Sequence, residues 1–363
     1  MTLASQTRNY YPALDGLRGV AILLVVFQHN FKFMIFFFGW LGVDLFFVLS
    51  GFLITDILLS SLGKPNFIRN FYIRRVLRIF PLYYFILIIC LFFLPNIKSL
   101  SLDMSYYTSN QVWQWTYLQN WLYVFKEPFG TPIILHTWSL AVEEQFYLLW
   151  PATILLIKKP KILLIIVSIL LVVVSATRFI LWTLHIKDLA YADLFIFTRI
   201  DGICVGCMLA IMLRFNPDLL RKYISMVVFG FAIINFGFYF LNRLYSYSLP
   251  YLAIVGYTTF AMLFGLLVYK AITNENKLIQ FIFNNSILKF FGKISYGLYV
   301  YHWPVKLLFF PFFKNFFLNK IAISSQNSEV CSAILVTIAA VLLSVISYRY
   351  FESPFLKFKT RYA

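Results

Sequence analysis

The amino-acid sequence predicts an all-α polytopic membrane protein, and three observations support that prediction. Of the 363 residues, 61% are hydrophobic and only 12% are charged, and the mean hydropathy is +0.80. A soluble core does not need so much apolar side chain. Apolar runs close to the ~20 residues that a bilayer requires recur along the whole chain. Finally, Lys and Arg gather in alternate connecting segments, as they do in membrane proteins of fixed orientation.

The apolar runs predict about ten transmembrane helices in one bundle. Their approximate bounds are 12–34, 39–60, 76–95, 139–157, 161–182, 193–213, 223–241, 249–269, 293–312 and 331–350. If the N-terminus is inside, the inner side carries 21 Lys and Arg, the outer side carries 9, and Arg199 lies within a span. This excess predicts that both termini are cytoplasmic. No hydrophilic segment is long enough for a second domain, so residues 1–363 are expected to form a single integral-membrane domain.

The composition also argues against several other functions. A net charge of +17 would suit a nucleic-acid partner, but here the charge lies in the predicted cytoplasmic loops, so none is expected. Four cysteines are too few for a disulfide framework. Cys204 and Cys207 form a CxxC without a second ligand pair, so no metal site is expected. Gly202 and Gly206 make a GxxxG on the same segment, which predicts close contact with another helix.

The first predicted span carries two ionisable groups on one face. Arg18 and His29 are eleven residues apart, which is nearly three helical turns and ~16 Å along the axis. A cation near the inner surface is thus aligned with an imidazole in the outer half. Two plainer interpretations stay open: Arg18 as a snorkelling anchor, and His29 as a structural histidine.

The next two spans add an acid and a basic cluster. Asp44 lies at a depth similar to that of His29 and is a candidate partner for it, or else an acid favoured by the dipole of a helix N-terminus. Arg74, Arg75 and Arg78 lie at the cytoplasmic mouth of the third span. Such a cluster can hold phosphates, although positive-inside anchoring explains it almost as well.

Residues 136–157 present two carboxylates at the head of an apolar stretch, where an unpaired charge is costly. Ser139 and Glu143 are four residues apart and share a helix face. Glu144 points ~100° away, so a single buried site would receive only Glu143 directly. The alternative is that Ser139 caps the helix while both acids complement its dipole. His136 precedes the helix at the expected outer surface, where it needs no function.

Later spans contain fewer ionisable groups. Arg199 and Asp201 lie in the outer half of the sixth span and are expected to pair with each other or with the earlier acids. His302 falls within a span, two residues before a helix-kinking proline. A structural interpretation is equally open for each of these residues.

Taken in order, these motifs resemble the membrane-bound acyltransferase-3 family, the transmembrane O-acyltransferases of bacterial surface sugars. The segments that carry the resemblance are 14–19 (LDGLRG), His29, 42–47 (GVDLFF) with 50–52 (SGF), 75–78 (RVLR), 139–143 (SLAVE), 295–299 (SYGLY) with 302–304 (HWP), and 352–354 (ESP). Each motif is weak alone, but the series spans nearly the whole chain.

The resemblance implies transfer of an acyl group, usually acetyl, from cytoplasmic acyl-CoA to a hydroxyl of an extracytoplasmic glycan or glycolipid, in the bacterial inner membrane. It implies that His29 acts as base or acyl carrier, with Glu143 or Asp44 orienting the ring. The expected acyl-CoA ligands are Arg18, Arg74, Arg75 and Arg78. The residues expected to contact the acceptor are Ser139, Glu144, Arg199 and His302. Some relatives carry an additional extracytoplasmic domain; with none expected in 1–363, a second transfer step would be missing or supplied in trans.

One competing function uses the same residues. A transporter or flippase for an anionic lipid-linked sugar would also need several spans and buried charges, without covalent chemistry. Pairing of His29 with a carboxylate favours the enzyme, and no inverted repeat is evident to favour the transporter.

Overall fold

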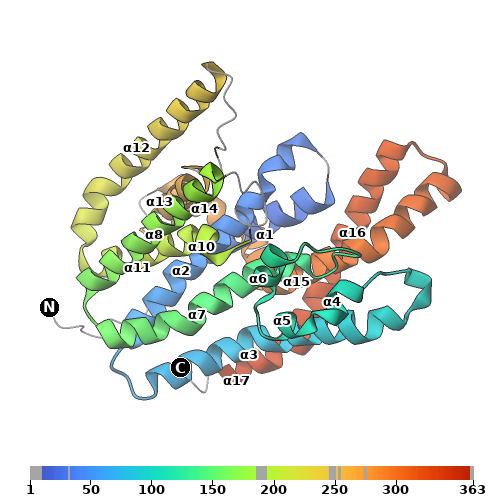
Figure 1. Cartoon of the computed structure of the whole chain (residues 1–363), viewed down its shortest axis with the longest axis horizontal. Helices are drawn as coiled ribbons and strands as arrows, with labels where there is room; N and C mark the ends of the chain where they lie inside the picture. Colours follow the sequence, from blue (N-terminus) through green and yellow to red (C-terminus); the bar gives the residue numbers. More distant parts are fainter. Residues whose placement is uncertain are drawn as a thin grey trace.

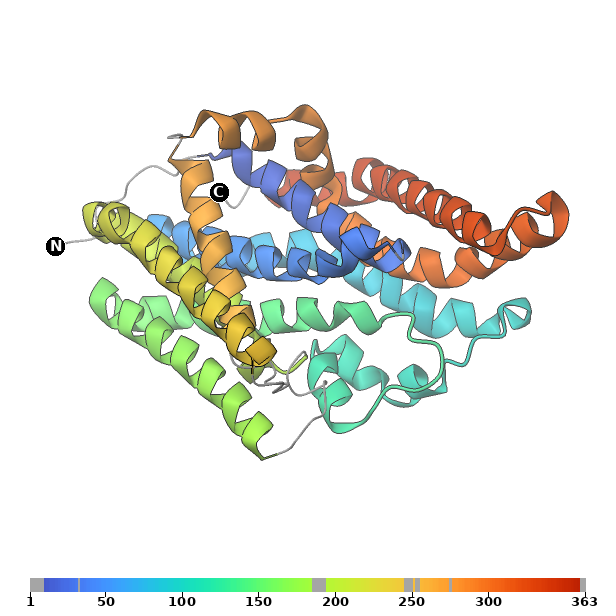
Figure 2. The ribbon, with the colours of Figure 1, turned by 90° about the horizontal axis from the view of Figure 1, so that it is seen from above.

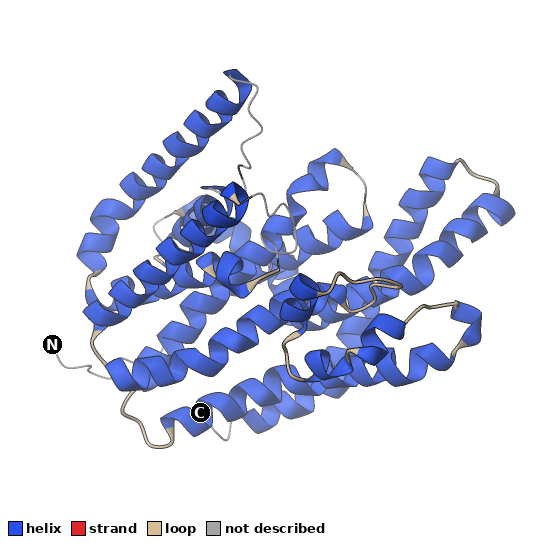
Figure 3. Ribbon diagram, viewed as in Figure 1, coloured by secondary structure: helices blue, strands red, loops and turns tan. Residues whose placement is uncertain are grey.

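The computed structural model describes residues 10–31, 33–184, 194–244, 251, 255–273 and 276–359. Within these ranges the chain is helical, with loops and no strand (Figures 1 and 3). The prediction of an all-α polytopic membrane protein is therefore confirmed. Both termini lie outside the described residues, and so does the start of the predicted span 249–269.

The described part contains seven helical segments that are long and apolar enough to cross a membrane. They are Pro12–Asn30, Phe38–Ser61, Phe67–Asn96, Leu135–Ile157, Pro160–Thr183, Pro217–Leu241 and Ser325–Phe358. The other three predicted spans correspond to α11 (Asp201–Phe215) with the short α10 (Ile196–Arg199), to α13 (Tyr257–Ile272), and to α15 (Ser286–Phe316). The total of ten spans and the cytoplasmic termini remain predictions.

The described ranges contain further helices, several of which form the membrane-crossing segments above. They are α1 (Pro12–Asn30), α2 (Leu41–Ser61), α3 (Phe67–Ile88), α4 (Ser105–Ser109), α5 (Gln111–Trp115), α6 (Gln119–Phe125), α7 (Trp138–Ile157), α8 (Pro160–Thr183), α12 (Pro217–Leu244), α14 (Lys277–Phe283), α16 (Ser325–Ser347) and α17 (Ser353–Lys359). Short 3₁₀ segments include Met34–Trp40 before α2 and Leu135–Thr137 before α7, and a π-helical turn, Tyr348–Glu352, precedes α17.

Helix α1 packs against both α2 and α15 (Figures 1 and 2). The LDGLRG segment can approach α15 closely because glycine has no side chain. At Gly292, a Cβ atom would come within 1.8 Å of the Asp15 carbonyl oxygen. The predicted close contact at the GxxxG is also confirmed, because a Cβ at Gly206 would come within 2.2 Å of the Val48 carbonyl oxygen in α2. A third close approach joins α2 to α1, because a Cβ at Gly42 would come within 2.3 Å of the Ala21 carbonyl oxygen, so α1 packs directly against both α2 and α15.

Candidate active site

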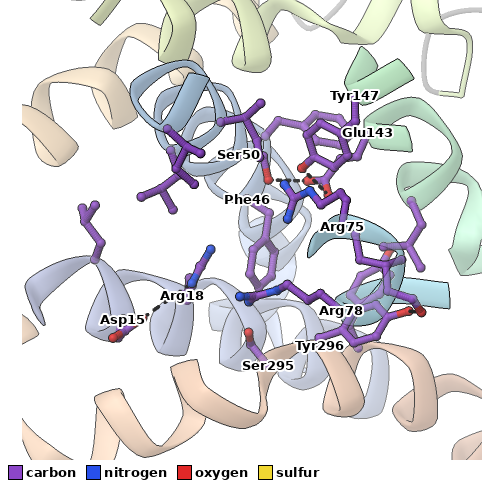
Figure 4. Close-up of a pocket in the computed structure, with 18 of the residues that line it drawn as sticks. Asp15, Arg18, Phe46, Ser50, Arg75, Arg78, Glu143, Tyr147, Ser295 and Tyr296 are labelled. Atoms are coloured by element: carbon purple, nitrogen blue, oxygen red, sulfur yellow. Dashed lines mark hydrogen bonds and ion pairs between the residues drawn. The ribbon is translucent and has the colours of Figure 1, made fainter. Parts of the chain in front are cut away.

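Five helices, α1, α2, α3, α7 and α15, enclose a cavity of about 210 Å³ (Figure 4). Arg18 enters it from α1, and Arg74, Arg75 and Arg78 enter it from α3. The structure thus brings together the four arginines that the sequence singled out. A cavity with this many guanidinium groups is suited to a polyanionic ligand, because guanidinium groups bind phosphate oxygens in pairs.

The arginine side chains are held before any ligand arrives. The guanidinium carbon of Arg75 lies 4.0 Å from the centre of the Tyr147 ring, and its Nε is buried without a hydrogen-bond partner. Arg18 Nη1 lies 3.5 Å from Asp15 Oδ1, in the same turn of α1. In Figure 4 the Arg78 side chain extends from α3 toward Arg18 of α1. Stacking on Tyr147 therefore orients Arg75, and the ion pair with Asp15 orients Arg18.

Three acids line this cavity: Asp15, which pairs with Arg18, Asp56, which pairs with Arg214, and Glu143. Glu143 binds hydroxyl groups instead of a cation. Its Oε1 accepts a hydrogen bond from Ser50 Oγ at 2.7 Å, and its Oε2 accepts one from Tyr147 OH at 3.1 Å (Figure 4). Glu143 thereby holds the ring on which Arg75 stacks. Glu144 is not among the lining residues, and its Oε1 is buried without a partner. Of the two neighbouring glutamates, only Glu143 therefore reaches the cavity, as the ~100° between successive residues of a helix predicts.

Two hydroxyl groups form a polar layer in the cavity wall. Ser139 and Tyr299 both line the cavity, and their hydroxyls are 2.6 Å apart. Tyr299 donates its one proton to the His136 carbonyl oxygen at 2.6 Å, so Ser139 is the donor to Tyr299. Ser139 is therefore engaged with α15 rather than capping α7. The Tyr299 ring lies between this cavity and a group of histidines.

That group consists of His29, His136 and His302. His29 Nδ1 lies 2.8 Å from His302 Nε2, and the two rings are parallel with centroids 5.1 Å apart. The ring of Trp303 meets His29 edge-on at 4.7 Å, and the Lys306 ammonium group donates to the His29 carbonyl oxygen. His302 is fully buried, whereas His29 is partly exposed. A base whose ring is held in this way can act on a hydroxyl that approaches its open side.

His136 enters the group because of a proline. Pro304 has no backbone N–H, so the carbonyl of Val300, four residues earlier in α15, loses its helical partner. His136 Nε2 lies 3.3 Å from that carbonyl oxygen and donates to it. The expectation that His136 is a surface residue is therefore wrong, since it is buried and its ring centroid lies 5.3 Å from that of His302. Among the described residues, no group of three His, Cys, Asp or Glu side chains could hold a metal ion.

Two predicted contacts of His29 are corrected by the structure. Asp44 forms an ion pair with Arg199 at 3.0 Å, and Glu143 binds hydroxyl groups instead. Arg199 stacks on Tyr257 at 3.8 Å and is buried, so it belongs to the packing of α2 against α10 and not to a surface that meets an acceptor. The physical reason is that opposite charges on neighbouring helices pair with each other when both lie away from water.

The other ionisable groups of this region are also paired. Asp201 pairs with Arg178 of α8 at 3.0 Å, and not with Arg199. His302, expected to contact the acceptor, cannot do so through its nitrogens. Its Nε2 faces His29 and its Nδ1 lies 2.7 Å from the Tyr299 carbonyl oxygen.

Sequence reasoning missed three residues of the site, each of which has a local signal. Tyr147 follows Glu143 by one helical turn, so a shared face could have been expected. Tyr299 precedes His302 by three residues and belongs to the same face of α15. His136 has only the indirect signal of Pro304, which frees a carbonyl in a different helix.

The fold and the site define a membrane protein with an arginine-lined cavity beside a hydrogen-bonded histidine pair. The family model Acyl_transf_3, described as "Acyltransferase domain", matches residues 11–349. The chain belongs to this acyltransferase family.

Curated relatives match along nearly all of the chain. The peptidoglycan O-acetyltransferase OatA of Listeria monocytogenes is 32% identical, over 97% of this chain and 56% of its own length. The putative peptidoglycan O-acetyltransferase YrhL of Bacillus subtilis is 30% identical, over 96% of this chain and 55% of its own. A putative O-acetyltransferase of Staphylococcus aureus is 28% identical, over 96% of this chain and 58% of its own. The chain thus spans a little over half the length of these relatives. No solved structure matches it.

Proposed function

We propose that this chain transfers an acetyl group from cytoplasmic acetyl-CoA to a hydroxyl of an extracytoplasmic glycan, with peptidoglycan as the acceptor that the named relatives suggest. The observation that carries the proposal is the arrangement along α1. Arg18 lines the arginine cavity, and His29, eleven residues further on, lies in the histidine group beyond the Tyr299 layer. We assign the chain to the bacterial plasma membrane, with the cavity on the cytoplasmic side and 1–363 acting as one domain.

The proposed donor fits the cavity by charge and by length. The phosphates of CoA would bind Arg18, Arg75 and Arg78, with Arg74 at the entrance. The ~16 Å between Arg18 and His29 along the helix is about the reach of an extended pantetheine arm. The thioester would then lie beside the Ser139–Tyr299 layer, close to His29. Glu143 serves the donor site by holding Tyr147 under Arg75.

The proposed reaction needs one base and no metal step. His29 takes the proton of the acceptor hydroxyl as the oxygen forms a bond to the acetyl carbonyl carbon. The carbon–sulfur bond breaks, and the departing CoA sulfur receives the proton from the His29 imidazolium. Family membership favours this chemistry over transport of a lipid-linked sugar by the same arginines.

The test is acetyl transfer from labelled acetyl-CoA in proteoliposomes that contain the full chain and peptidoglycan fragments. His29→Ala is expected to lower the transfer rate by about 10²–10⁴-fold, the usual contribution of a positioned base. It should still bind acetyl-CoA, because His29 does not line the cavity. His185→Ala is the control histidine variant and should transfer at the wild-type rate. A His29→Ala protein that keeps more than about a tenth of the activity would remove this base from the mechanism.

A further inference from the structure

His302 has a fixed arrangement of protons. Its Nδ1 lies 2.7 Å from the Tyr299 carbonyl oxygen and 3.2 Å from the Leu298 carbonyl oxygen. A carbonyl oxygen only accepts hydrogen bonds, so Nδ1 carries a hydrogen. No carboxylate contacts His302 in the described part of the chain, and a lone buried cation is costly in a membrane, so the ring is neutral. Its Nε2 therefore carries a lone pair.

The proton arrangement of His302 determines that of His29. His302 Nε2 can only accept, and His29 Nδ1 is 2.8 Å away, so His29 Nδ1 is the donor. A neutral imidazole has one N–H, which leaves His29 Nε2 with the lone pair. This nitrogen has no hydrogen-bond partner among the residues that the structure describes, and His29 is partly exposed. Only this nitrogen of the pair can take a proton without breaking a hydrogen bond.

We propose that His302 is a positioning residue that fixes the tautomer of His29, so that Nε2 of His29 is the atom that removes the acceptor proton. The inference rests on the proposed function. In other enzymes a carboxylate holds the catalytic histidine in the correct tautomer. Here a second, neutral histidine does so, and backbone carbonyls of α15 hold that histidine in turn.

The same hydrogen bonds serve both states of the reaction. When His29 Nε2 takes the hydroxyl proton, the ring becomes an imidazolium with hydrogens on both nitrogens. Its Nδ1–H continues to donate to His302 Nε2, and no second proton moves. When Nε2 returns its proton to the CoA sulfur, the ring is again in its starting tautomer. The Trp303 edge at 4.7 Å and the parallel His302 ring keep the imidazole plane fixed throughout.

The proposal is tested with two substitutions that differ in one property. His302→Gln can keep an acceptor oxygen near the place of Nε2, whereas His302→Phe fills similar space with no acceptor. We expect His302→Phe to lower kcat by about 10²-fold or more, the effect of a wrong tautomer on a catalytic histidine. His302→Gln should retain activity within about tenfold of wild type, because His29 keeps its acceptor. The KM for acetyl-CoA should change little in both, since His302 does not line the cavity.

The tautomer itself is measured on the full chain in lipid nanodiscs. The protein has four histidines, and with only histidine labelled by ¹⁵N, the nitrogen shifts separate Nδ1–H from Nε2–H rings. The His29 signals are assigned by their loss in His29→Ala. We expect the Nδ1–H form in the wild type and in His302→Gln, and a shift toward Nε2–H in His302→Phe.

The possible results distinguish a failure of the His302 proposal from a failure of the proposed acetyl-CoA donor. An Nε2–H ring at His29 in the wild type overturns the proposal, and so does a His302→Phe protein with wild-type kcat. If His302→Phe fails to fold, as judged by acetyl-CoA binding, the wild-type tautomer and the His302→Gln rates still decide. A wild-type protein that binds no acetyl-CoA but shows the Nδ1–H tautomer refutes the proposed donor and leaves the histidine pair intact.

Discussion

Replacement of Arg75 tests the donor cavity most directly. Its guanidinium stacks on Tyr147 at 4.0 Å and has a buried Nε without a partner, so it is oriented to donate to an incoming anion. A hydrogen bond to a charged group contributes about 1.5–3 kcal/mol. Because 1.4 kcal/mol is tenfold in affinity, Arg75→Ala should raise the Kd for acetyl-CoA by about 10- to 150-fold. Arg75→Lys should recover only part of this, because lysine lacks the planar fork that stacks and binds in pairs.

The measurement is equilibrium binding of acetyl-CoA to the purified full chain. Arg69→Ala is the matched control, because Arg69 lies on the same helix, is exposed and does not line the cavity. Repeating the titrations with dephospho-CoA shows whether Arg75 binds the 3′-phosphate. If it does, Arg75→Ala should change the Kd for dephospho-CoA only slightly, because the phosphate that Arg75 would bind is missing from that ligand. If Arg75→Ala binds like wild type and like Arg69→Ala, the arginine cluster is an orientation signal and the cavity is not the donor site.

Two further predictions concern stability. Asp44→Asn should leave the buried Arg199 charge uncompensated and destabilise the fold by about 3–5 kcal/mol, which is measured as a lower thermal midpoint. The double variant Asp44→Leu with Arg199→Met replaces the ion pair by apolar side chains and should recover most of that loss. Equal midpoints in the wild type and both variants would contradict this prediction. Gly292→Ala should prevent α1 from docking on α15 and abolish monodisperse expression. The control is Gly237→Ala in α12, where a Cβ meets nothing within 4 Å, and this variant should express normally. The prediction fails if both variants express alike.

Some features of the site depend on residue spacing within one helix, and others depend on how several helices pack together. Within a helix, residue spacing determines direction, so the sequence could align Arg18 with His29 and separate Glu143 from Glu144. It could also place the arginine cluster at one end of a span. These expectations depend only on the helical period, and the structure agrees with them where it describes these residues.

Partners on different helices could not be predicted in this way. Asp44 and Glu143 were the expected partners of His29, and depth alone did not say which helix lies beside α1. The crossing of α15 at Gly292 brings His302 to His29 across 273 residues of sequence. Asp44 faces α10 instead, where Arg199 neutralises it.

The amino-acid sequence by itself therefore determined the membrane class, the course of most spans, the acyltransferase resemblance and the face on which each ionisable group lies, because apolar length and helical periodicity are local properties. Only the tertiary structure decided which buried polar side chains on different helices pair with each other. Which buried charge meets which depends on the close glycine contacts between distant helices and on the cost of leaving any polar group unpaired in lipid. For that reason a histidine, and not either predicted carboxylate, lies against His29.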